Sequence, residues 1–136
     1  MYKIRPNIEA LMPYSTARDE YKGGDISVWL DANESPYDNG VNRYPDPHQK
    51  QLKQALAALK GVSADQLFLG NGSDEAIDLC FRIFCEPGID NVVAITPTYG
   101  MYAVAAAINN VEVKEVALST TDFSLLVDDM LSATDN

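Results

Sequence analysis

The chain has 136 residues, of which 46% are hydrophobic and 22% are charged, and this composition is typical of one folded globular unit rather than a disordered segment. Its formal net charge of −10 argues against nucleic-acid binding, because no basic stripe is present to displace counterions from phosphates. Residues 1–20 contain no uninterrupted apolar run. We therefore expect neither a signal peptide nor a membrane anchor, and we expect a cytoplasmic protein.

The first 45 residues are dense in turn-forming residues and contain one short strand-like run at 26–30, a pattern typical of an arm rather than a domain. From residue 46 onward the pattern becomes regular. It predicts a helix at 52–59 ended by Gly61, a strand at 67–69, a helix at 73–84, a strand at 92–96, a helix at 99–108, a strand at 111–118 and a helix near 125–131. Strands that alternate with helices predict an α/β fold with a mainly parallel sheet.

Two cysteines, Cys80 and Cys85, lie five positions apart. This spacing suits neither a disulfide framework nor a Cys-x-x-Cys metal or redox motif. Because free cysteine is usually buried and inert, we expect both to be small core residues, and we predict no metal site.

Residues 69–75, with the sequence Leu-Gly-Asn-Gly-Ser-Asp-Glu, form the most informative segment, in which a short apolar run breaks into glycines and then into a helix. The first N–H groups of such a helix lack intrahelical partners, so the turn is suited to hold a phosphate. It matches neither a P-loop nor a full dinucleotide-binding motif. The alternative is a glycine-eased corner with Ser73 as N-cap and with Asp74 and Glu75 favouring the helix dipole.

Three further motifs accompany this turn in a fixed order: Asp-Ala-Asn-Glu-Ser-Pro at 31–36, Arg-Tyr-Pro-Asp-Pro at 43–47 and Pro-Thr-Tyr-Gly-Met-Tyr at 97–102. On these motifs the chain resembles the N-terminal part of the histidinol-phosphate aminotransferase family, whose members are fold-type I, class II enzymes that use pyridoxal 5'-phosphate (PLP). The resemblance runs over essentially the whole chain. It implies the PLP-dependent transferase fold, with an arm and small-domain contribution at 1–45 and an incomplete first part of the large PLP-binding domain at 46–136.

The resemblance also assigns roles to residues. Backbone amides of Ser73, Asp74 and Glu75 would hold the PLP phosphate, and Tyr44 would reach the same phosphate from the neighbouring subunit of a homodimer. Tyr99 would stack on the pyridine ring. Tyr14 and Asn33 would border the substrate, with Tyr14 near its phosphate, although an Asn at position 33 is also compatible with a simple turn.

The implied reaction exchanges an amino group between L-histidinol phosphate and 2-oxoglutarate or glutamate. The sequence departs from the family at one point, because none of its lysines lies in the Ser-x-x-Lys-like context of the Schiff-base lysine: Lys3, Lys22, Lys50, Lys53, Lys60 and Lys114. We therefore expect an N-terminal fragment that holds no catalytic residue and is inactive alone. Two alternatives stay open, a threonine-phosphate decarboxylase-like PLP enzyme and a non-catalytic phosphate- or PLP-binding fragment.

Overall fold

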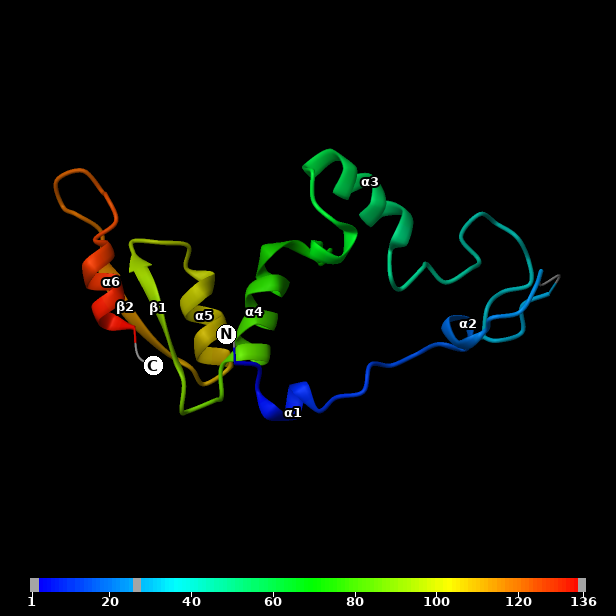
Figure 1. Cartoon of the computed structure of the whole chain (residues 1–136), viewed down its shortest axis with the longest axis horizontal. Helices are drawn as coiled ribbons and strands as arrows, with labels where there is room; N and C mark the ends of the chain where they lie inside the picture. The colour runs from blue at the N-terminus through cyan, green and yellow to red at the C-terminus, as the bar shows by residue number, and fades with distance from the viewer. Residues whose placement is uncertain (1–2, 26–27, 135–136) are drawn as a thin grey trace. The chain divides into compact units, whose positions relative to one another are not determined.

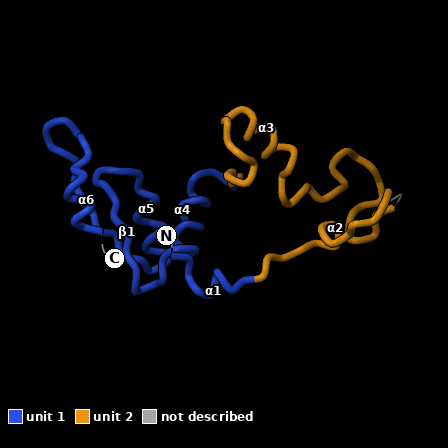
Figure 2. The backbone as a smooth tube through the Cα atoms, in the orientation of Figure 1, with its two compact units in different colours: residues 1–11, 70–136 blue, residues 12–69 orange. Residues whose placement is uncertain are grey.

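The computed structural model describes residues 3–25 and 28–134, and the chain divides into two compact units. Unit 1 comprises residues 1–11 and 70–136, and unit 2 comprises residues 12–69 (Figure 2). The predicted division at residue 45 concerns the complete family fold, and it stays a prediction.

Unit 1 is built on a parallel pair of strands, β1 (Asn91–Thr96) and β2 (Glu112–Ala117), whose register runs from Asn91 beside Glu112 to Thr96 beside Ala117. Helix α5 (Met101–Ile108) connects the two strands, and helix α4 (Gly72–Phe84) packs against α5 (Figure 1). Helix α6 (Val127–Ala133) contacts β2. The predicted α/β alternation and the parallel pairing are therefore confirmed.

The core of unit 1 lies where α4, α5 and the start of β2 meet. Ala106 is fully buried and Ala105 is 3% exposed, and both belong to the apolar, alanine-rich α5. Small side chains at these positions let the α4 and α5 backbones approach closely, while alanine also favours the helix itself. The remaining members of the buried cluster are Phe81, Cys85 and Val111.

The N-terminal segment is attached to the carboxyl end of α4 through Arg5. The Arg5 backbone N–H donates to the Ile83 carbonyl at 2.9 Å, and its guanidinium donates to the Arg82 carbonyl at 3.0 Å. The same side chain pairs with Glu86 at 3.2 Å. Because the last carbonyls of a helix lack intrahelical donors, these bonds both end α4 and hold the short helix α1 (Pro6–Glu9) beside it.

Unit 2 contains helices α2 (Ala17–Glu20) and α3 (Lys50–Lys60) and the 3₁₀ turn η1 (Ala64–Gln66). Helix α3 confirms the predicted helix, and Gly61 ends it with φ 67°, a left-handed conformation that glycine adopts without strain. Within the described residues of this unit, no segment is paired as a strand.

Four sequence predictions need correction. The runs at 67–69 and 28–30 are not strands, because a strand requires a hydrogen-bonded neighbour and neither run is paired; residues 26–27 lie outside the described residues. Cys85 is buried as predicted, within the cluster that contains Phe81, but Cys80 is exposed because it is not part of that cluster. The N-cap of α4 is Asn71, not Ser73.

Among the described residues, no helix has the length and hydropathy needed to cross a membrane.

Candidate functional site

The amino end of α4 has the backbone conformation that the glycine turn suggested. Gly72 begins the helix with φ 78°, and a Cβ placed on it would meet no atom within 4 Å. The conformation, and not crowding, therefore favours glycine at this position. Ser73 follows as the second helical residue, where its backbone N–H has no intrahelical acceptor and its side chain is not the cap.

Two carboxylates stand in this first turn, and each is engaged by a donor. The Glu75 carboxylate turns back and accepts the backbone N–H of Asn71 at 2.5 Å, which fixes the turn that precedes the helix. The Asp74 carboxylate accepts a hydrogen bond from the Tyr99 hydroxyl at 3.1 Å. Both negative charges also interact favourably with the positive end of the helix dipole.

Tyr99 lies in the connection between the carboxyl end of β1 and the start of α5. Its hydroxyl bond to Asp74 holds the ring beside the amino end of α4, and its ring meets Tyr102 edge-to-face with centroids 6.2 Å apart. The hydrogen bond to the Asp74 carboxylate raises the pKa of the Tyr99 phenol, because it favours the protonated donor form. Four residues predicted for the cofactor are thus brought together in unit 1: Ser73, Asp74, Glu75 and Tyr99.

This arrangement fits a phosphate attached to an aromatic ring. The first-turn N–H groups supply donors, the helix dipole favours an anion, and the exposed Tyr99 supplies an aromatic face. The two carboxylates are already bound to their own donors, Asn71 N–H and Tyr99 hydroxyl. In open α/β sheets, the carboxyl ends of parallel strands are also where ligands bind.

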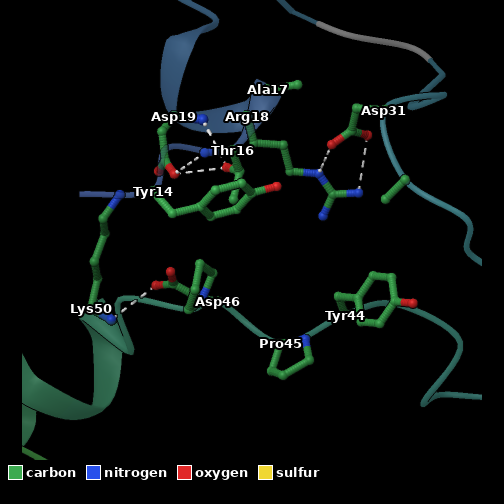
Figure 3. Close-up of a pocket in the computed structure, with 12 residues that line it drawn as sticks. Tyr14, Thr16, Ala17, Arg18, Asp19, Asp31, Tyr44, Pro45, Asp46 and Lys50 are labelled. Carbon is green, nitrogen blue, oxygen red and sulfur yellow. Dashed lines mark hydrogen bonds and ion pairs between the residues drawn. The ribbon is translucent and has the colours of Figure 1, made fainter. Parts of the chain in front are cut away.

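Tyr14 and Tyr44 lie together in unit 2, where they line a pocket of about 750 Å³. Figure 3 shows the segment 44–46 running opposite Tyr14, with the Arg18 guanidinium directed at Asp31. Both tyrosines are exposed, Tyr14 by 89% and Tyr44 by 63%. The lining also contains two cationic side chains, Arg18 and Lys50, and three carboxylates, Asp19, Asp31 and Asp46. Arg18 is paired with Asp31 at 2.7 Å, so the groups left to a ligand are chiefly the exposed phenol hydroxyls.

Asn33 is not part of this pocket. It lines a smaller hollow of about 200 Å³ that also includes Tyr44 and is bounded by residues 34–35 and 41–43. Tyr44 therefore borders both hollows. The structure brings Tyr14 to Tyr44 and Asn33 to Tyr44, but it does not bring Tyr14 and Asn33 into one pocket.

Sequence reasoning missed Glu34, whose side chain is only 3% exposed. One carboxylate oxygen accepts the Tyr44 backbone N–H at 2.8 Å, and the other accepts Arg18 at 2.8 Å and Arg43 at 2.9 Å. These donors stabilise the anion and lower the pKa of Glu34 to about 2, with the Tyr44 bond the largest cause. Glu34 therefore stabilises the folded loop fully above the ordinary pKa of 4.5, and the contribution disappears as pH falls towards 2. The only sequence signal for this role of Glu34 was an arginine on each side of it along the chain, Arg18 and Arg43.

Comparison with known proteins identifies a family and several proteins that are similar in sequence to this chain. The family model for aminotransferase class I and II matches residues 17–136. Proteins named histidinol-phosphate aminotransferase are similar to the chain: 61% identical over 131 residues in Bacteroides thetaiotaomicron, 58% over 132 residues in Parabacteroides distasonis and 54% over 134 residues in Cytophaga hutchinsonii.

These matches cover nearly all of this chain but a minor part of each relative. They extend over 96%, 97% and 96% of the chain respectively, and over 38% of the length of each of the three relatives. The family match includes the amino end of α4, the Tyr99 connection and the pocket residues from Arg18 onward. The chain belongs to the aminotransferase class I and II family.

Proposed function

We propose that these residues form part of an enzyme that transfers an amino group between L-histidinol phosphate and 2-oxoglutarate. The observation that carries the proposal is the identity of about 60% to proteins named histidinol-phosphate aminotransferase, sustained over 96% of the chain. That similarity favours this substrate over the phosphothreonine of the decarboxylase alternative. The similarity also favours a catalytic protein over a non-catalytic binding fragment. In this proposal the Schiff-base lysine is supplied by the full-length protein.

The cofactor of the proposed reaction is PLP, which supplies an electron sink for the carbanion at the substrate Cα. The residues of this chain would bind and orient it. Backbone N–H groups of Ser73, Asp74 and Glu75 would donate to the phosphate, and Tyr99 would lie against the pyridine ring. The hydrogen bond from the Tyr99 hydroxyl to Asp74 supports this assignment, because it fixes the stacking residue relative to the phosphate-binding turn.

The residues of unit 2 would complete the site in a homodimer. Tyr44 would donate its hydroxyl proton to the PLP phosphate of the neighbouring subunit, and Tyr14 and Asn33 would border the substrate. The exposure of Tyr44 and its place in the lining of the pocket support a role towards a phosphate group. In this proposal each active site contains residues from two chains.

The direct test is a transamination assay of the full-length protein. With L-histidinol phosphate and 2-oxoglutarate we expect glutamate to form, and with O-phosphothreonine we expect no carbon dioxide release. Glutamate production is measured by a coupled dehydrogenase reaction. Carbon dioxide release without glutamate formation would contradict the proposal and favour the decarboxylase.

Tyr44→Phe tests the proposed phosphate contact. The substitution removes one hydrogen bond to a charged group, so PLP binding should weaken by roughly 1.5–3 kcal/mol, or about 10- to 150-fold in Kd. The Kd is measured by titrating the apo-protein with PLP and following absorbance. Unchanged affinity would remove Tyr44 from the cofactor site.

A mixing experiment checks whether the site is shared between subunits. Inactive Tyr44 and lysine-site variants of the full-length protein are mixed under conditions that exchange subunits. If Tyr44 acts across the dimer, one of the two sites in a heterodimer carries both intact groups, and activity should return. No recovery in verified heterodimers would argue that Tyr44 serves its own chain.

Ser73→Pro and Gly72→Val test whether main-chain groups hold the phosphate. Proline removes the N–H at a position where the helix does not use it, and valine is strained at φ 78°. Both variants should lose PLP on dialysis, as measured by absorbance, at protein levels that still fold by circular dichroism.

Two matched variants separate phosphate binding from general damage. Ser73→Ala keeps the backbone N–H, and Gly61→Val introduces comparable strain at φ 67° at the end of α3. Both should retain PLP. Folded Ser73→Pro and Gly72→Val proteins that keep their cofactor would show that the turn is only a corner of the fold.

A further inference from the structure

Glu34 joins the two ends of a loop that carries Tyr44. Its carboxylate binds the Tyr44 backbone N–H through one oxygen, and it binds the Arg43 and Arg18 guanidinium groups through the other. The ends of the loop are tied once more by the Asn42 side chain, which donates to the Ser35 carbonyl at 3.1 Å. The closure of residues 34–44 therefore depends on contacts at its base, and the nearly buried Glu34 carboxylate makes most of them.

The loop base is itself anchored to the preceding segment. Arg18 pairs with Asp31 at 2.7 Å as well as with Glu34 at 2.8 Å, and its guanidinium lies 5.0 Å from the Trp29 ring centroid. An arginine held by two carboxylates and an aromatic face has little freedom to move. Glu34 therefore connects Tyr44 to a side chain that is itself held in place by other contacts.

The main chain on the other side of Tyr44 is fixed in the same manner. The Asp46 carboxylate accepts the backbone N–H groups of His48 and Lys50, each at 2.9 Å, and so connects the segment to the start of α3. Between these two attachments the Tyr44 residue is 63% exposed. The backbone of Tyr44 is held while its phenol remains open to a ligand.

We propose that Glu34 is a positioning residue for Tyr44, holding its main chain so that the phenol hydroxyl is presented to a phosphate group. The inference rests on the proposed function, in which Tyr44 donates to the PLP phosphate. Glu34 itself has no direct contact with the cofactor in this account. Its contribution to PLP binding passes entirely through Tyr44.

The requirement is for a carboxylate rather than for any polar side chain. Three donors converge on Glu34, and an ionised carboxylate offers only acceptors to them. In Glu34→Gln one of the two oxygens becomes an NH₂ group, which faces a donor and repels it. The variant keeps the size of the side chain but leaves at least one of the three donors without its acceptor.

A double-mutant cycle on the full-length apo-protein tests the proposal, with PLP as the titrant and Kd as the readout. Glu34→Gln should weaken PLP binding roughly tenfold, the equivalent of one ordinary hydrogen bond, and by no more than Tyr44→Phe does. In the Tyr44→Phe background the same change should alter Kd less than about twofold, because its effect passes through the missing hydroxyl. A merely structural role would instead multiply the two losses.

Asp38→Asn is the matched control for charge and loop position. Asp38 belongs to the same loop and accepts the Gly40 backbone N–H at 2.9 Å, whereas the Tyr44 backbone N–H is accepted by Glu34. The variant removes one negative charge as Glu34→Gln does, and it should leave the PLP Kd unchanged. An equal loss in Asp38→Asn would attribute the effect to charge or general loop damage and would overturn the proposal.

The remaining outcomes separate this inference from the proposed function. If Tyr44→Phe weakens PLP binding and Glu34→Gln does not, Glu34 has no positioning role while the function stands. If Tyr44→Phe has no effect, the cofactor role of Tyr44 fails and the inference fails with it. If Glu34→Gln does not fold by circular dichroism, Glu34→Asp takes its place in the cycle, since its shorter side chain keeps the charge but cannot span the same donors. In the cycle with either Glu34 variant, losses of PLP affinity that multiply with the loss in Tyr44→Phe would overturn the proposal.

Discussion

Carboxylate side chains that accept main-chain N–H groups hold the irregular parts of this chain in place. Glu75 fixes the turn before α4 through Asn71, Glu34 fixes the backbone of Tyr44, and Asp46 fixes the start of α3. Each bond engages a strong donor that no regular helix or sheet would satisfy at that point. The net charge of −10 therefore reflects, in part, a structural use of acidic residues in segments that build the candidate site.

Much of the regular structure could be predicted from the sequence because hydrophobic periodicity reports local geometry. Helices α3 and α4 and strands β1 and β2 lie within a few residues of their predicted ranges. The prediction failed at 67–69 and 28–30, where an apolar run indicates a strand but the pairing partner decides whether one forms. The N-cap of α4 was misplaced by two residues because Gly72, in a left-handed conformation, already begins the helix.

The candidate site was predicted from motifs in the sequence, but its internal contacts were not. Ser73, Asp74 and Tyr99 follow from the glycine turn and the family resemblance, whereas the bond between the Tyr99 hydroxyl and Asp74 joins residues 25 positions apart. Similarly, Glu34 stood within a recognised motif, yet its role depends on an arginine 16 positions earlier in the chain. Such contacts depend on how segments pack together, and spacing along one sequence does not specify them.

We propose that the amino end of α4 binds the PLP phosphate through main-chain N–H groups, with Tyr99 beside the ring. A crystal structure of the full-length protein with PLP bound tests it most directly. We expect phosphate oxygens within about 3 Å of the Ser73, Asp74 and Glu75 backbone nitrogens, the range of charge-assisted hydrogen bonds, and the Tyr99 ring against the pyridine. A phosphate bound elsewhere, with the first turn of α4 facing only solvent, would contradict it.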